Sequence, residues 1–253
     1  MHAFWVALQF LTRLPVPRAV SAGAQERGRS VPYYPVVGLL LGALMTGMQG
    51  LLAGTDVALQ SALVLLAWTL LTGGLHLDGL ADSADAWAGS HGDRAKALRI
   101  MKDATSGPAG VAAVTLVLLV KFTALSVLIR ENIWPALIIA PVLGRAAIVL
   151  VLLTTSYVRP GGLGAAQATL MPRRSAVAML VIIIMATLAS GWLGIGAVAA
   201  AVGLLLVLRT MMVRRLGGAT GDTLGATCEL VEAVVVVTIA LIAPVYLPSR
   251  TGG

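Results

Sequence analysis

The stretch Gly73-Gly74-Leu75-His76-Leu77-Asp78-Gly79-Leu80-Ala81-Asp82-Ser83-Ala84-Asp85 directly follows a long apolar run and precedes a basic segment. On a helix, Asp78, Asp82 and Asp85 are spaced i, i+4 and i+7, which places them within roughly 60° on one face. Like charges this close repel each other, so another group must compensate them. Mg²⁺ binds a few carboxylates and takes further ligands from substrate phosphates, so the stretch predicts a magnesium site.

The composition is that of a membrane protein, with 58% hydrophobic and only 11% charged residues, far from the usual quarter charged. We therefore expect one all-α domain over residues 1–253, folded as a polytopic transmembrane helical bundle. The net charge of +7 would suit a nucleic-acid partner. The basic residues lie in short loops between apolar segments, however, which favours membrane topology as their cause and no nucleic acid as partner. The single cysteine excludes an internal disulfide.

Seven segments approach the roughly 20 apolar residues that a membrane-spanning helix needs. The fifth and sixth are short and separated by only two residues, so the number of spans over residues 176–212 stays open. The seven segments cover residues 35–54, 57–75, 110–129, 135–154, 176–191, 194–212 and 230–247.

The residues around the first span carry three weaker patterns. Residues 1–18 predict a helix lying in the membrane interface, because their apolar side chains form a helical stripe. Residues 20–30 are polar and contain glycine, which predicts a loop. Closely spaced glycines along the first span predict tight helix packing; they are Gly38, Gly42, Gly47, Gly50 and Gly54.

The distribution of basic residues predicts the orientation of the bundle. Loops on one side of the predicted membrane carry 14 Lys or Arg residues, and those on the other side carry 2. Because positive loops stay in the cytoplasm, the N-terminus is expected there and the C-terminus outside. The three aspartates and the loops 159–174 and 209–228 then share the cytoplasmic side.

Two cations lie inside otherwise apolar spans. Lys121 and Arg145 have no acid at i±3 or i±4, and an ionisable residue at that depth is costly without a partner. Their partners must come from other helices or from a substrate such as a diphosphate. Structural ion pairing and substrate binding are both open.

Other charged residues have both a chemical and a structural interpretation. Lys102 and Asp103 precede a span and could help to hold phosphate near a helix N-terminus, or could form an ordinary cap. Arg159 starts a glycine-rich segment, and arginine can grip phosphate with two donors. His76 could bind a metal, act as a base or lie at the membrane interface. A second acidic group either completes the first or caps a helix; its members are Asp222, Glu229 and Glu232.

Five segments in the same order along the chain resemble the cobalamin synthase family. They are residues 10–17 (FLTRLPVP), 34–42 (YPVVGLLLG), 73–85, 161–164 (GGLG) and 221–226 (GDTLGA). The resemblance implies a Mg²⁺-dependent transferase in the bacterial cytoplasmic (inner) membrane. Such an enzyme moves the phospho-cobinamide moiety of adenosylcobinamide-GDP to α-ribazole or its 5′-phosphate and releases GMP. The product is adenosylcobalamin or its 5′-phosphate, late in cobalamin biosynthesis.

That reaction assigns expected roles to the residues. Asp78, Asp82 and Asp85 are the expected Mg²⁺ ligands, and Asp82 or Asp85 is the expected general base, with His76 as a further catalytic candidate. The expected partners are the corrinoid and ribazole substrates and the lipid bilayer, and a homo-oligomer is compatible with the sequence. The expected substrate-binding residues are Lys102, Asp103, Lys121, Arg145, Arg159, Asp222, Glu229 and Glu232.

Two other functions fit part of the pattern. A CDP-alcohol type lipid phosphotransferase also pairs glycine-flanked aspartates with a divalent metal, and it would release CMP in place of GMP. A secondary transporter could use the acids and buried cations as an ion relay, but no inverted repeat of broken helices is evident. Turnover in detergent, without a membrane gradient, separates an enzyme from a transporter.

Overall fold

The chain folds into a bundle of helices in the computed structural model, which describes residues 2–16, 23–159 and 162–246. These ranges contain no β-strand, only an isolated bridge between Tyr157 and Ala219. The predicted all-α class is confirmed. In chain order the helices are α1 (His2–Leu11), α2 (Ala24–Ser30), the 3-10 helix η1 (Val31–Tyr33), α3 (Tyr34–Leu51), α4 (Val57–Thr72), α5 (Leu75–Gly89), α6 (Arg94–Ile100), α7 (Pro108–Arg130), α8 (Pro135–Thr154), α9 (Leu163–Leu170), α10 (Arg173–Leu188), α11 (Trp192–Leu216) and α12 (Gly221–Tyr246).

Five helices in the described ranges are long and apolar enough to cross a membrane. One is the continuous run Ala24–Leu51, formed by α2, η1 and α3, and the others are α7, α8, α11 and α12. Two pairs pass the same test only as bent units: α4 with α5 is bent by 86°, and α9 with α10 by 95°. If each pair is one span, the total is the seven that the sequence predicts.

The predicted span boundaries agree best with the observed helix at α8 and least at α12. Helix α8 covers residues 135–154 as predicted, whereas α12 begins at Gly221 and not at residue 230. The first turns of α12 contain Asp222 and Glu229, which lower the hydropathy of that segment although both side chains have partners inside the protein. The predicted end of this span at residue 247 lies outside the described residues.

The N-terminal region is more helical than predicted. Helix α1 confirms that the first residues form a helix, while its place in the membrane interface remains a prediction. Residues 24–30, predicted to be part of a loop, form α2. Glu26 lies in its first turn and Arg27 and Arg29 in its last, which suits the helix dipole at both ends. Residues 20–22 of the predicted loop lie outside the described ranges.

Helix α8 lies in the middle of the bundle. Within the most apolar window of each helix, 83% of α8 is buried but only 17% of α11. Helices α3 and α12 both pack along α8. At Gly42 an added Cβ would lie 2.6 Å from Ile138 Cα, and Gly38 approaches the Pro141 carbonyl as closely. Tight packing is thus confirmed for these two glycines and wrong for three others, Gly47, Gly50 and Gly54, which face open space.

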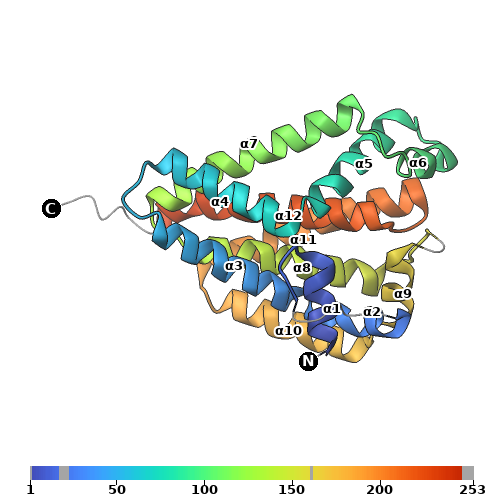
Figure 1. The fold of residues 1–253 in the computed structure, drawn as a ribbon, viewed down its shortest axis with the longest axis horizontal. Coiled ribbons are helices and arrows are strands. Elements are labelled where there is room, and N and C mark those ends of the chain that lie inside the picture. Colours follow the sequence, from blue (N-terminus) through green and yellow to red (C-terminus); the bar gives the residue numbers. More distant parts are fainter. Residues whose placement is uncertain (1, 17–22, 160–161, 247–253) are drawn as a thin grey trace.

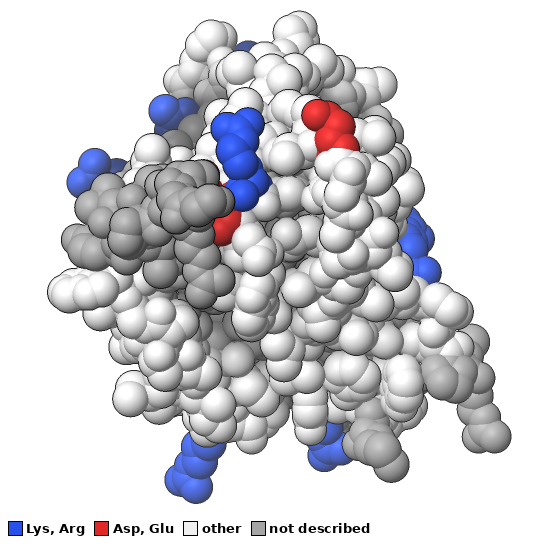
Figure 2. All heavy atoms as spheres, turned by 90° about the vertical axis from the view of Figure 1, so that its left-hand side faces the viewer, with Lys and Arg blue, Asp and Glu red and all other residues white. Residues whose placement is uncertain are grey.

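A pair of glycines turns the acidic stretch across one end of the bundle. Gly73 and Gly74 have φ values of +62° and +71°, a left-handed backbone that glycine adopts readily. They separate α4 from α5, and the Arg13 side chain lies so close against Gly73 that any Cβ there would collide with it. Helices α2, α5, α6 and α9 lie toward this end, on the right in Figure 1. Figure 2 faces the other end, which carries few charged side chains.

Candidate active site

A cavity of about 490 Å³ opens at the end of the bundle where α5 lies. Its walls come from α1, α3, α5, α8, α9, the start of α12 and the segments after α6 and α8, so residues far apart in the sequence meet there. The polar and aromatic residues that line it are Phe10, Tyr34, His76, Asp78, Lys102, Tyr157, Arg159, Gln167 and Asp222.

The acidic face of α5 borders this cavity. Asp78 lines it, and Asp82, one turn further on, lies within electrostatic range of Asp78, Asp85 and Asp222. No hydrogen bond or ion pair of the described residues involves the carboxylates of Asp78 or Asp82. Asp78 is exposed and Asp82 is half-buried, so the oxygens of both are free to bind a cation or a substrate proton.

Asp85 makes different contacts from the other two acids of α5. Its Oδ2 accepts a hydrogen bond from Gly107 N at 2.7 Å, and its Oδ1 accepts one from Gly110 N at 2.8 Å. These are unpaired backbone donors at the N-terminus of α7, where a carboxylate is favourable. Both glycines are required, because a Cβ at either position would collide with the Asp85 carboxylate. Asp85 therefore joins α5 to α7.

The cations of the cavity are Arg159 and Lys102. Arg159 Nη1 donates to Asp222 Oδ2 at 2.8 Å, and both side chains remain partly exposed. Lys102 lines the wall and has no acidic partner within the described ranges. Burial raises the pKa of the nearby Tyr157 phenol, so this group stays protonated and can donate a hydrogen bond into the cavity. The cavity thus offers positive charge and neutral donors opposite the acids.

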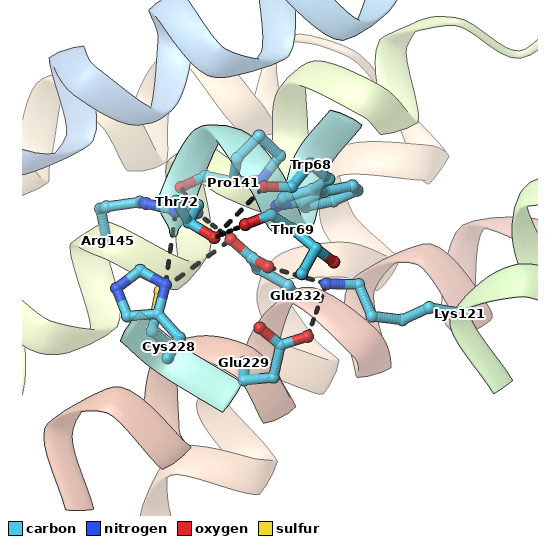
Figure 3. Close-up of polar contacts among 10 residues, drawn as sticks. Trp68, Thr69, Thr72, Lys121, Pro141, Arg145, Cys228, Glu229 and Glu232 are labelled. Carbon is cyan, nitrogen blue, oxygen red and sulfur yellow. Dashed lines mark hydrogen bonds and ion pairs between the residues drawn. The ribbon is translucent and has the colours of Figure 1, made fainter. Parts of the chain in front are cut away.

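Lys121 and Arg145 lie in a buried ion network with Glu229 and Glu232 (Figure 3). Lys121 Nζ donates to Glu229 Oε1 at 2.7 Å and to Glu232 Oε2 at 2.9 Å, and it lies 4.0 Å from the centre of the Trp68 ring. Arg145 pairs with the other oxygen of Glu232. The exposed fractions are 1% for Lys121, 0% for Arg145, 5% for Glu229 and 0% for Glu232. Two cations and two acids balance each other without solvent.

Close helix packing makes this network possible. Gly144 precedes Arg145 on α8, and a Cβ there would lie 2.8 Å from Glu232 Cγ on α12. The absence of a side chain lets Glu232 lie against α8, within reach of both cations. Of the two sources expected for these partners, another helix or a substrate, the structure shows another helix, α12.

His76 connects the ion network with the cavity. Arg145 Nη2 lies 3.4 Å from His76 Nδ1, and because a guanidinium can only donate, Nδ1 must accept. A neutral imidazole then carries its proton on Nε2. This Nε2 is buried without a partner among the described groups, in a side chain that lines the cavity. His76 can therefore donate one hydrogen bond to a bound molecule.

A triad of possible metal ligands lies in the network and not on the acidic face. Donor atoms of His76, Cys228 and Glu232 lie within 4.8 Å of one another, and no such group of three is found among the described acids of α5. Both oxygens of Glu232 already bind Lys121 and Arg145. A cation there would have to displace two buried positive charges, so the triad is a poor metal site.

The structure brings together only part of the predicted site. His76, Asp78, Lys102, Arg159 and Asp222 line one cavity, with Asp82 beside it. The other predicted residues lie elsewhere: Asp85 at the α7 N-terminus, Lys121, Arg145, Glu229 and Glu232 in the ion network, and Asp103 in an exposed turn where its carboxylate accepts from Thr105.

Sequence reasoning missed several residues of the cavity wall. Phe10, Tyr34, Tyr157 and Gln167 come from four separate segments, and no local pattern marks them as one group. The glycine-rich segment 161–164 indicated part of this wall, since Gly162 and Gly164 lie against the side chain of Tyr157. Gly161 in that segment lies outside the described residues.

Comparisons with known proteins identify the family of the chain. The family model of cobalamin-5-phosphate synthase matches residues 3–240. The chain is 52% identical over 242 residues to an adenosylcobinamide-GDP ribazoletransferase of Pseudomonas putida KT2440, covering 95% of this chain and 99% of that protein. It is 49% identical over 243 residues to a protein of the same name from Pseudomonas savastanoi pv. phaseolicola, covering 96% of this chain and 100% of that protein. No solved structure matches the chain. A match of this length shows that the chain belongs to the cobalamin-5-phosphate synthase family.

Proposed function

We propose that this chain transfers the phospho-cobinamide moiety of adenosylcobinamide-GDP to α-ribazole or α-ribazole 5′-phosphate at the 490 Å³ cavity. The ribazole hydroxyl oxygen attacks the phosphorus attached to the cobinamide arm. The bond from that phosphorus to the oxygen of GMP breaks, and the hydroxyl proton passes to a carboxylate. The observation that carries the proposal is a cavity whose wall holds the carboxylate of Asp78 and the ammonium of Lys102, both unpaired among the described residues, beside the Arg159–Asp222 pair.

The cations of the cavity suit the diphosphate of the donor substrate. Phosphoryl transfer needs alignment and charge neutralisation more than covalent help from the protein. Arg159 can donate in a planar fork to phosphate oxygens, and Lys102 adds a point charge. The Nε2–H of His76 can donate to a phosphoryl oxygen on the side of the ion network. His76 then acts as a hydrogen-bond donor and not as a base.

Asp78 and Asp82 are the acids that fit Mg²⁺. Their oxygens are hard ligands and are free of protein partners, which is the donor set that this ion prefers. Bound there, Mg²⁺ would supply charge neutralisation for the phosphates. We leave Asp85 out of the proposed ligand set because each of its oxygens already accepts a hydrogen bond from the N-terminus of α7. Whichever of Asp78 and Asp82 is nearer the ribazole hydroxyl accepts its proton.

The cavity end of the bundle is the proposed cytoplasmic side, with the N-terminus on that side as well. The charge asymmetry of the loops supports this orientation. Two exposed alanines provide a matched test: Ala95 in α6 near the cavity end and Ala53 in the α3–α4 turn at the other. Ala95→Cys should react with an impermeant thiol reagent only from the cytoplasmic side, and Ala53→Cys only from outside. Labelling of both from the same side would contradict the topology.

The activity is tested with the purified full chain in detergent. Adenosylcobinamide-GDP and α-ribazole should give GMP and adenosylcobalamin without any membrane gradient, EDTA should stop the reaction, and Mg²⁺ should restore it. The same preparation with a CDP-alcohol and a second alcohol should give no CMP. Absence of GMP release from folded protein supplied with Mg²⁺ and either ribazole substrate would overturn the proposal.

A further inference from the structure

A groove of about 250 Å³, separate from the cavity, lies on the face of α5 opposite its acids. Three helices form it, and each contributes residues at the spacing of a single helix face. Apart from a few hydroxyl groups and one indole nitrogen, the lining is apolar. The lining residues are Leu80, Ser83, Ala84 and Trp87 of α5, Leu208, Met211 and Met212 of α11, and Thr223, Ala226, Thr227 and Leu230 of α12.

The groove changes character along its length. One end is formed by leucines, Leu80, Leu208 and Leu230, one from each helix. The other end is formed by Trp87 and Thr223, at the C-terminal part of α5 and the N-terminal part of α12. An apolar groove that ends at a tryptophan is typical of a site at a membrane surface, where tryptophan is favoured.

Two hydrogen-bond donors in the groove have no partner. Ser83 is only 8% exposed, and its Oγ bonds to no group of the described chain. Trp87 Nε1, one turn further along α5, is also buried without a partner. Leaving such groups unsatisfied is costly, and in native structures they usually mark an absent ligand or water. Both donors belong to side chains that line the groove, so acceptor oxygens of a ligand beside Ser83 and Trp87 would satisfy them.

Arg215 provides positive charge at the polar end. It follows Met212 by one turn of α11, donates from Nη1 to the Trp87 carbonyl at 3.2 Å, and holds its guanidinium carbon 6.0 Å from the Trp87 ring centre. Arg215 has no acidic partner in the ranges that the structure describes. Its remaining donors are free for an anion in front of Trp87.

We propose that this groove binds one anionic phospholipid of the surrounding bilayer. An acyl chain lies against the leucine end, the ester carbonyl oxygens accept from Ser83 and Trp87, and the phosphate lies at Arg215. The order of apolar, acceptor and anionic parts in a phospholipid matches the order of lining groups in the groove. The site is separate from the cavity with the acids and does not depend on the proposed transferase activity.

Native mass spectrometry of the full chain, released from vesicles with equal phosphatidylglycerol and phosphatidylcholine, tests this site. We expect one phosphatidylglycerol retained in preference to phosphatidylcholine. Arg215→Gln should lower its retention roughly five- to ten-fold, the effect of one charge near a lipid phosphate. Ala84→Leu should also lower it, because the added side chain fills the groove. Arg174→Gln, at an exposed basic residue of α10, is the matched control and should change nothing.

The wild-type chain alone can refute the proposal, so the test does not depend on the variants folding. No retained phospholipid, or equal retention of the two lipids, would overturn it. Equal loss in Arg215→Gln and Arg174→Gln would show a general surface attraction and would overturn it as well. Inorganic phosphate alone should not raise the melting temperature, because the site requires the chain and the head group together.

Discussion

The chain contains two groups of charges that differ in almost every respect. In the ion network of Lys121, Arg145, Glu229 and Glu232, each charge has a partner and none reaches solvent. At the cavity, the exposed Asp78 and Lys102 and the half-buried Asp82 beside them have no hydrogen-bond or ion-pair partner among the described residues. The sequence predicts the aspartates as a metal site and leaves substrate binding and a structural role both open for the members of the ion network.

The difference separates charges that stabilise the protein from charges that act on a substrate. In a balanced network inside an apolar environment, no cation is left unpaired to bind a phosphate. Removing one member leaves its partner as an uncompensated buried charge. An unbalanced group is unfavourable until a cation or an anion binds, so its cost is recovered in the complex. His76 is the contact between the two groups, because Nδ1 faces Arg145 while Nε2 lies unpartnered at the cavity.

The largest effect is expected for the free acids. Asp78→Asn and Asp82→Asn should each lower GMP release about 10³- to 10⁴-fold at an unchanged melting temperature, because they remove charge from the site of phosphoryl transfer. Asp85→Asn should lower the melting temperature instead, since it weakens the attachment of α7 to α5. Near-normal turnover in both Asp78→Asn and Asp82→Asn would remove the acidic face from the mechanism.

Substitutions in the ion network should lower the stability of the protein and leave the specific activity of the folded fraction unchanged. Lys121→Met leaves Glu229 and part of Glu232 buried without a cation, which should cost about 3–5 kcal/mol and lower both yield and melting temperature. The double variant Lys121→Met with Glu229→Gln restores neutrality and should recover much of this loss. The specific activity of the folded fraction is the second measurement. A normal melting temperature with reduced turnover would assign Lys121 to substrate binding after all.

Arg159 should show the reverse pattern. Arg159→Gln removes one charge-assisted contact to a diphosphate, worth about 1.5–3 kcal/mol, or roughly a 10- to 100-fold loss in kcat/KM. Its pair with Asp222 is partly exposed, so the melting temperature should change little. If Arg159→Gln behaved like Lys121→Met, the division into a stabilising and a substrate-binding group would fail.

The smallest effect is expected at Asp103. Its carboxylate accepts from the Thr105 hydroxyl and backbone N–H in an exposed turn, and these hydrogen bonds lower the pKa of Asp103. Asp103→Asn should keep GMP release within about two-fold of the wild type, as is usual for a surface substitution. A loss comparable to that in Asp82→Asn would place this turn at the substrate and enlarge the site.

The sequence predicted the helical class and most spans because hydropathy and helix length are local properties. Helix α8 was predicted well since Pro135 and a polar break after Thr154 mark its ends. The start of α12 was not, because Asp222 and Glu229 look like solvent-exposed residues until Arg159 and Lys121 are placed beside them. The pairing that makes these acids compatible with a buried helix is a tertiary property.

The candidate site was predicted in part for the same reason. The i, i+4 spacing of Asp78 and Asp82 identified an acidic face without any structure. The same spacing rule placed Asp85 on that face but could not show that Gly107 and Gly110 occupy its oxygens. Aromatic residues such as Tyr34 and Tyr157 join the cavity only through the packing of distant segments, which a single sequence does not encode in a readable pattern.

The ion network also constrains how the protein is made. Lys121 precedes its partner Glu229 by 108 residues, and Arg145 precedes Glu232 by 87. At about 5–20 residues per second, a ribosome needs roughly 4–22 s to reach the acids after it has made the cations. During that interval α7 and α8 each hold a cation at membrane depth that costs about 2.5–3.5 kcal/mol on insertion scales. Helix α12 therefore completes assembly, because nascent chains that stop before Glu229 keep two unneutralised cations at membrane depth.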